Sequence, residues 1–147
     1  MTTKLTWVLA HEPYDLFLRA AEKFSAEVSK KTAGAFEIEI LGLQEYAQKY
    51  RNGVTVDNRT GLLDLVESGQ VQLSQMYTTT LGQKSQDMFV LDLPFLFEGH
   101  EHAERVLDGK IGQQLFNKLS QESKIQGLAF TYSGGFRIVP SSEPIGK

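Results

Sequence analysis

The first forty residues alternate between two hydrophobic periods, and this alternation limits the folds open to the chain. Residues 4–10 (KLTWVLA) read as a strand that carries Trp7 and Leu9 on one face and further apolar residues on the other. Burial on both faces is typical of an internal strand in a parallel sheet. Helical spacing follows over 14–31, and residues 36–41 (FEIEIL) alternate again. This order predicts a parallel βαβ unit in an α/β fold with a mostly parallel sheet and flanking helices.

Further elements are predicted along the rest of the chain. Asn58 or Thr60 is the expected cap of a short helix that ends at Gly69. Residues 44–58 are polar and give no clear element, and the threonines at 78–80 read as a loop after a strand. The other expected elements are a strand at 70–77, an apolar bend at 92–97, a helix at 100–120 and a last strand at 124–131.

Composition excludes several classes of function. The 147 residues fit one domain, with 41% hydrophobic and 22% charged residues. A net charge of −3 gives no electrostatic footprint for nucleic acid, and no apolar run approaches the roughly 18 residues of a membrane span. Without cysteine, the chain has no disulfides and no thiolate chemistry. Met1 leads almost directly into a strand, so we expect a cytoplasmic protein or a mature form whose leader has been removed.

One arginine near the end of the chain is the leading candidate for binding an anion. Arg137 follows Gly134, Gly135 and Phe136 in a Gly-rich bend. The guanidinium presents a fixed fork of donors that can bind a carboxylate through two parallel hydrogen bonds. A solvated surface arginine is the alternative interpretation of the same residue.

Polar and aromatic side chains also follow two of the predicted strands. His11, Glu12 and Tyr14 come after the first strand, and Tyr77 ends a later one. In open α/β sheets, ligands bind outside the carboxyl ends of the strands, so these four residues are candidates for a pocket wall. A solvated loop at His11 and Glu12, and simple packing of Tyr77, remain the alternatives.

Two other groups were weighed as sites. Phe95, in the apolar bend, suits a core position or a platform for ligand. His100 and His102 are a candidate metal pair, but residues two apart do not share a helix face, so we expect no bound metal. No nucleotide, hydrolase or zinc-protease motif occurs, and no cofactor is expected.

Taken together, four segments carry a resemblance to a known family. They are AEKFSAEVSKKTAGAFEIEI, LLDLVESGQVQL, LDLPFLFEGHEHAERVLDGKIGQQL and GLAFTYSGGFRIVPSSEPI, and they follow one another over nearly the whole chain. In order and approximate spacing the chain resembles the solute-binding proteins of tripartite ATP-independent periplasmic (TRAP) transporters. The combination of the LPFLF turn, the DGKIG helix and the GGFR bend is what makes the resemblance specific.

The resemblance implies a fold and a function. The fold is a lobe of the periplasmic-binding-protein type II kind, and the function is capture of a small organic acid in the periplasm. The family catalyses no reaction and delivers its ligand to the permease subunits of a transporter in the membrane. Arg137 falls on a position that contacts the ligand carboxylate in the family. His11, Glu12 and Tyr77 fall on segments that line the family's cleft.

The chain also departs from the family pattern. It ends at Lys147, before a segment like LKGLKIRV that would supply a second arginine, and members of the family are roughly twice as long. We therefore expect residues 1–133 to be an amino-terminal lobe and 134–147 the start of a hinge crossing toward a missing second lobe. Design of the expressed piece, proteolysis or a truncated gene would each explain such an end. Self-association is expected, because such a lobe exposes sheet edge and apolar surface.

Two other classes of function stay open on the sequence alone. A small α/β or metal-dependent hydrolase could use His11, His100, His102 and nearby carboxylates, although no nucleophile, base and orienting group are evident together. A compact interaction domain that uses an exposed edge is the third class. Sequence downstream of Lys147 would distinguish the receptor from that third class.

Overall fold

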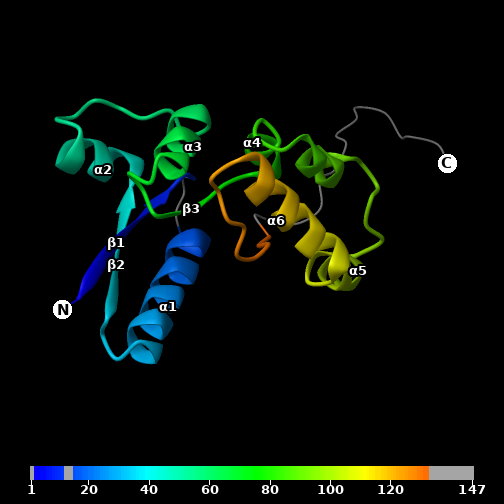
Figure 1. The fold of residues 1–147 in the computed structure, drawn as a ribbon, viewed down its shortest axis with the longest axis horizontal. Coiled ribbons are helices and arrows are strands. Elements are labelled where there is room, and N and C mark those ends of the chain that lie inside the picture. Colours follow the sequence, from blue (N-terminus) through cyan, green and yellow to red (C-terminus); the bar gives the residue numbers. More distant parts are fainter. Residues whose placement is uncertain (1, 12–14, 133–147) are drawn as a thin grey trace, which may run out of the picture.

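Three parallel strands form the sheet on which the rest of the chain is assembled (Figure 1). The computed structural model describes residues 2–11 and 15–132. In chain order these contain β1 (Thr3–Leu9), α1 (Asp15–Lys31), β2 (Phe36–Gly42), α2 (Leu43–Tyr50), α3 (Thr60–Glu67), β3 (Leu73–Gln75), α4 (Thr78–Leu81), the 3-10 helix η1 (Gln86–Asp92), α5 (His100–Leu107) and α6 (Lys110–Glu122).

The order of the strands is β2-β1-β3, so β1 is the central strand. Trp7 of β1 lies opposite Ile40 of β2 on one side and Leu73 of β3 on the other, and both pairings are parallel. The predicted βαβ unit and the α/β class with a parallel sheet are therefore confirmed. Residues 134–147, expected to begin a hinge crossing, lie outside the described residues.

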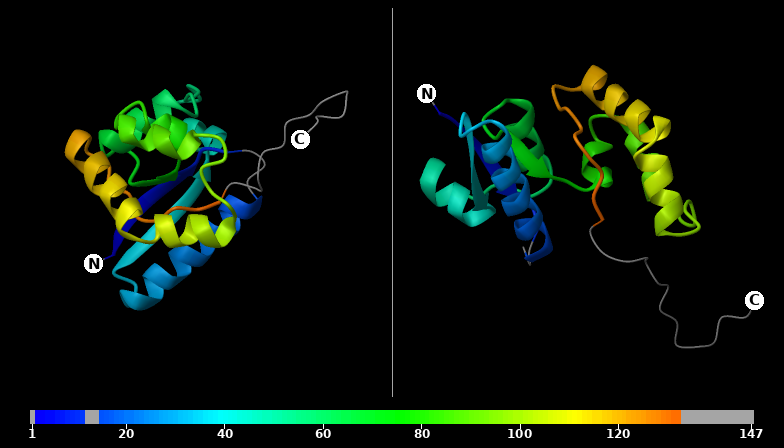
Figure 2. Two further views of the ribbon diagram at one scale, coloured as in Figure 1. Left: turned by 90° about the vertical axis from the view of Figure 1, so that its right-hand side faces the viewer. Right: turned by 90° about the horizontal axis from the view of Figure 1, so that it is seen from below.

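The two faces of β1 are covered by different helices, as its two-sided apolar pattern requires. Trp7 and Leu9 pack against Ala21 of α1. Val8 and Ala10 belong to a second cluster that includes Tyr46 of α2 and residues of α3. The helix α1 thus lies on one face of the sheet, and α2 and α3 lie on the other (Figure 2).

The second half of the described chain lies beside the sheet and is reached through β3 (Figure 1). Its core joins Leu63 of α3 to Met88 of η1, and to Leu115 and Leu119 of α6. Ile125, just after α6, completes the same cluster. Because Leu63 belongs to a helix that packs on the sheet, this cluster fixes α6 relative to the strands.

The segment predicted to be irregular contains a helix, α2. Tyr46 and Ala47 are the buried residues of α2, and they form the face of the helix that packs inward. At its start the backbone N–H of Gly42 donates to Oε2 of Glu45 at 2.8 Å. A glutamate at the third position of a helix commonly marks the start of that helix. The surrounding residues here are also polar, so Glu45 did not stand out in the sequence.

Neither of the expected residues caps α3. Oδ2 of Asp57 accepts from the backbone N–H groups of Arg59, Thr60 and Gly61 at 3.1, 2.7 and 3.3 Å. The Thr60 hydroxyl donates to the same oxygen at 2.9 Å. Asp57 therefore satisfies donors that would otherwise lack partners in the first turn. The helix ends as predicted just before Gly69, which has a positive φ of 76°.

The helix predicted over 100–120 is divided into α5 and α6. The break falls at Asp108 and Gly109. The first turn of α6 approaches the end of α5 so closely that a Cβ on Gly112 would lie 1.8 Å from the carbonyl oxygen of Leu107. Two glycines that lower helix propensity here permit a corner between two helices.

Three other expectations are corrected. The strand expected over 70–77 is limited to Leu73–Gln75, and the threonines expected in a loop begin α4. Residues 124–131 are not assigned to a strand, because the backbone there pairs with no other described strand. Two of its apolar side chains, Ile125 and Phe130, pack on the α6 core instead.

Candidate functional site

Two of the residues predicted to line a pocket meet at the carboxyl edge of the sheet. Leu9, the last residue of β1, lies opposite Gln75, the last residue of β3. His11 follows the first strand and Tyr77 follows the second, and their rings lie with centroids 4.0 Å apart and planes 30° apart. The parallel pairing of β1 with β3 is what brings these two side chains together.

A third ring holds His11 from the side of α1. Phe17 lies 4.9 Å from the imidazole, with an edge-to-face geometry of 61°. Burial lowers the pKa of His11 below its ordinary value, and a hydrogen bond to the backbone of Ala10 partly opposes this shift. The imidazole is therefore biased toward its neutral form, which costs less to desolvate than the charged form.

Two hydrogen bonds involve the residues next to this aromatic pair in the sequence, Ala10 and Thr78. Nδ2 of Asn58 donates to the carbonyl oxygen of Ala10 at 3.5 Å. The Thr78 hydroxyl donates to Oδ1 of Asp92 at 3.0 Å, which ties the start of α4 to the end of η1. Asn58 and Asp92 were not singled out as site residues from the sequence. Only the pairing of distant segments places them near the strand ends, and no local motif marks them.

Four further residues are predicted for the site. Glu12, Tyr14 and Arg137 lie outside the described residues. Phe95 is 97% exposed with a positive φ of 59°, so the expectation of a core position is wrong. It follows Pro94 in a turn after η1, and among the described residues it makes no ring contact with His11 or Tyr77.

The two histidines weighed as metal ligands have separate environments. Nδ1 of His102 accepts from the backbone N–H of Glu98 at 3.3 Å, and its ring contacts Phe97. The His100 ring meets Tyr132 edge-on at 5.0 Å. Over residues 2–11 and 15–132, no group of three or more histidine, aspartate or glutamate side chains could hold a metal ion. None of the helices in that same part of the chain has the length and apolarity to cross a membrane.

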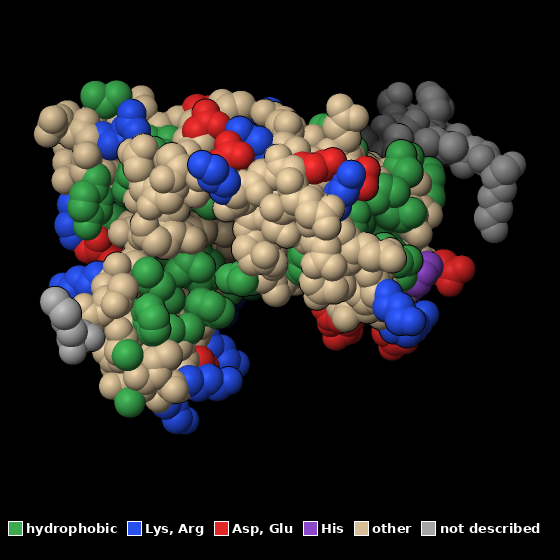
Figure 3. Space-filling model, in the orientation of Figure 1, with side chains coloured by type: hydrophobic (Ala, Val, Ile, Leu, Met, Phe, Trp, Pro, Cys, Tyr) green, Lys and Arg blue, Asp and Glu red, His purple; other side chains and the backbone are tan. Residues whose placement is uncertain are grey.

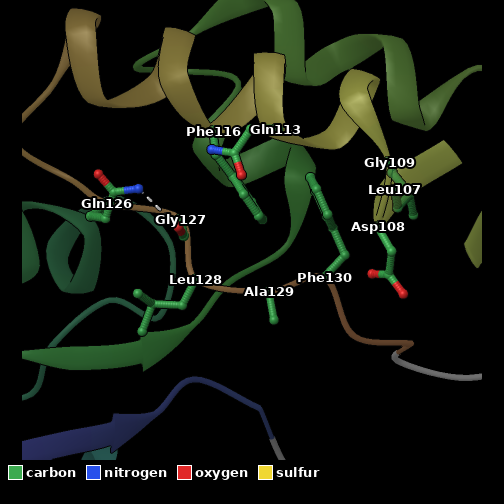
Figure 4. A pocket seen from close by; sticks show the side chains of 10 residues that line it. All are labelled: Leu107, Asp108, Gly109, Gln113, Phe116, Gln126, Gly127, Leu128, Ala129 and Phe130. Carbon is green, nitrogen blue, oxygen red and sulfur yellow. Dashed lines mark hydrogen bonds between the residues drawn. The ribbon is translucent and has the colours of Figure 1, made fainter.

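A pocket of about 310 Å³ lies elsewhere, between the α5–α6 corner and residues 126–130 (Figure 4). Phe116 and Phe130 form its apolar part, and Gln113 and Asp108 add polar groups. Its size is at the lower limit for small-molecule sites. The carboxylate of Asp108 on its wall disfavours an anionic ligand, so the aromatic pair at the strand ends is the stronger candidate for a carboxylate.

A parallel sheet with helices on both faces and side chains gathered at its carboxyl edge matches one lobe of a periplasmic binding protein. The family model for bacterial extracellular solute-binding protein, family 7, matches residues 10–147. The chain therefore belongs to this family, whose members include the solute-binding proteins of TRAP transporters.

Individual relatives agree with this assignment. The C4-dicarboxylate-binding protein DctB of Bacillus subtilis is 30% identical over 126 residues, which are 86% of this chain and 33% of DctB. A TRAP periplasmic solute-binding protein from Polaromonas sp. JS666, bound to D-erythronate, has a TM-score of 0.63 at 26% identity, covering 82% of this chain and 36% of that one.

A third comparison supports the fold alone. The sugar acid binding protein DctPAm of Advenella mimigardefordensis, in complex with galactonate, has a TM-score of 0.68 at 23% identity. The match covers 82% of this chain and 36% of that protein. The chain thus spans about a third of the length of the curated relatives it matches.

Proposed function

We propose that this chain forms the amino-terminal lobe of a receptor that captures a small organic acid outside the cytoplasmic membrane and delivers it to a TRAP-type transporter. The observation that carries the proposal is the family match over residues 10–147. Relatives named for C4-dicarboxylate binding and bound to D-erythronate support a carboxylate as the ligand. In this proposal the protein binds its ligand and catalyses no reaction.

The proposed site has two kinds of wall. His11 and Tyr77 supply an aromatic wall at the carboxyl edge of β1 and β3. Glu12 and Tyr14, which follow His11 in the sequence, are further proposed members of this wall. Arg137 supplies the charge that pairs with the ligand carboxylate. A neutral His11 adds no second positive charge to a site in which Arg137 is the proposed partner of the anion.

Residues 1–133 form one lobe in this proposal, and residues 134–147 begin the crossing to a second. A small-molecule site usually buries about 70–90% of the ligand surface, more than a single wall covers. Closure of a second lobe would exclude water and strengthen the pairing between Arg137 and the carboxylate. The periplasm is the proposed location, and the permease subunits of the transporter are the proposed partners.

Calorimetry on the full-length gene product tests this function. Succinate and D-erythronate are the first ligands to titrate, with succinamide as the uncharged control for the dicarboxylate. We expect at least one organic acid to bind with a Kd in the micromolar range or below, and its amide to bind at least tenfold more weakly. Equal binding of acid and amide would contradict recognition of a carboxylate.

A further inference from the structure

The cluster of rings at the strand ends is built from three separate elements. His11 lies after the end of β1, Phe17 lies in α1, and Tyr77 immediately precedes α4. Phe17 is partly buried and packs against the core cluster between α1 and the sheet, so one end of the series of rings contacts the core. His11 is held between Phe17 and Tyr77 at 4.9 and 4.0 Å. The order from the core outward is therefore Phe17, His11, Tyr77.

Tyr77 ends this series with much of its ring uncovered. It is 42% exposed although it contacts His11 almost face to face. His11 lies against one face of the ring, so a further ring could contact Tyr77 only on its other face or its edge. Within the described residues, the Tyr77 hydroxyl has no hydrogen-bond partner, and Tyr77 belongs to none of the three core clusters. The fold therefore leaves partly uncovered an aromatic residue that His11 contacts on one face, with Phe17 on the other side of His11.

The position of this face relates it to the proposed site. It lies where the two neighbouring strands β1 and β3 end, the edge at which ligands bind in open parallel sheets. In the space-filling view the molecular outline is indented between α1 and the α5–α6 pair (Figure 3). Aromatic rings prefer offset-stacked or edge-to-face contacts with other rings. A ring that already packs against a neighbouring ring loses little freedom when a further ring is added.

We propose that the open face of Tyr77 stacks against an aromatic ring of the ligand, so that the preferred ligand is an aromatic carboxylate. This inference rests on the proposed function, because it assumes that the carboxyl edge of the sheet binds an organic acid. Tyr77 is the specificity-determining residue, and His11 and Phe17 position it. The ligand ring packs on Tyr77 as a fourth ring in the series. The carboxylate of the ligand remains available to pair with a positive charge.

Calorimetry on the full-length gene product tests the role of the ring. The probes are benzoate, phenylacetate and 3-phenylpropanoate, each compared with the acid in which cyclohexane replaces the benzene ring. The saturated partner keeps the size and charge and lacks the π-face. We expect at least one aromatic acid to bind about 2- to 12-fold more tightly than its saturated partner, which is the range for an aromatic pair.

Variants assign that preference to Tyr77. Tyr77→Phe should keep it, because the ring is retained. Tyr77→Leu and Tyr77→Ala should abolish it, and circular dichroism on both checks that the fold survives. Tyr50→Ala, which removes another exposed tyrosine from α2, is the control and should leave the preference unchanged.

Two results on the aromatic preference would overturn the proposal, and two results on binding itself would do so as well. One is equal binding of aromatic and saturated acids by the wild type, and the other is a preference that persists in Tyr77→Leu and Tyr77→Ala. Binding of succinate or D-erythronate together with no binding of any aromatic acid would overturn the inference and leave the proposed function intact. Failure of all organic acids to bind would overturn both.

Discussion

The rings of Phe116 and Phe130 stack with their centroids 4.3 Å apart and their planes only 11° apart. Phe116 belongs to α6, and Phe130 belongs to the extended segment that follows it. A Cβ added to Gly127 would lie 2.0 Å from Cδ1 of Phe116, so the backbone of the segment also passes against the same ring (Figure 4). These contacts hold a segment that has no strand pairing within the described residues.

The first prediction follows from this close approach. Gly127→Ala should destabilise the protein by about 1–3 kcal/mol, because the new methyl group forces the Phe116 ring from its position. Leu128→Ala is the matched control, since Leu128 is 65% exposed and its loss should change stability by less than about 0.5 kcal/mol. Urea denaturation of both variants measures the difference. Equal stability of the two would show that Phe116 does not pack on the segment.

The second prediction separates two neighbouring residues at the start of α3. Asp57→Ala should lower the melting temperature by roughly 2–5 °C, because Asp57 satisfies donors of the first helical turn. Asn58→Ala should have a smaller effect, since Asn58 makes one long hydrogen bond to Ala10. Thermal denaturation followed by circular dichroism gives both values. A larger loss in Asn58→Ala would mean that the cap is wrongly assigned.

The capping interaction of Asp57 also has a defined pH dependence. The Thr60 hydroxyl bond, with backbone donors of the same turn, lowers the pKa of Asp57 below its usual value of 3.8. A carboxylate with a lowered folded pKa adds stability above its unfolded pKa and loses it as pH falls through the folded pKa. The difference in melting temperature between wild type and Asp57→Ala should therefore be full at pH 7 and shrink below pH 4.

Much of the fold could be predicted because its signals are local. The two-sided apolar pattern of β1, the stripe of α1 and the alternation of β2 lie within about 40 residues, and the structure has them nearly where expected. The α5–α6 corner could not be predicted, since it depends on contact between Gly112 and Leu107 in three dimensions. Residues 124–131 have a strand-like pattern, but a strand also needs a partner, which a pattern does not supply.

The candidate site divides in the same way. His11 and Tyr77 could be singled out because His11 follows one predicted strand and Tyr77 ends another. Their contact depends on β1 and β3 being neighbours, which follows from sheet order rather than from local sequence. The contact between Phe17 and His11 could not be predicted, because helical spacing marks Phe17 only as a core residue.

The third prediction concerns the protonation of His11. Burial lowers its pKa in the folded state below the usual 6.5, so between the two pKa values the unfolded chain binds more protons than the folded one. Stability should therefore rise with pH in this window, and acid should begin to destabilise the protein as pH falls below about 6.5. His11→Gln should remove this part of the pH dependence. Melting temperatures between pH 5 and 8 test it, and identical profiles for both proteins would contradict it.

The fourth prediction concerns Arg137 in the full-length protein. If it pairs with the ligand carboxylate through two hydrogen bonds, Arg137→Lys keeps the charge but loses the planar fork and should weaken binding measurably. Arg137→Ala should weaken it further, because each charge-assisted bond contributes roughly 1.5–3 kcal/mol. Calorimetry with the tightest organic acid found provides the test. A Kd for Arg137→Ala within threefold of wild type would assign this arginine a structural role.

The last prediction concerns self-association of residues 1–147 expressed alone. In the described residues β3 lies at the edge of the sheet, so one side of its backbone pairs with no other strand there. Exposed apolar side chains elsewhere on the described surface are a second cause of association, with Leu128 and Phe95 among the most exposed. Open edges and exposed apolar surface both favour association between chains.

Light scattering at increasing protein concentration should therefore show a rising mean mass. A strictly monomeric species at high concentration, with cooperative unfolding, would contradict the prediction.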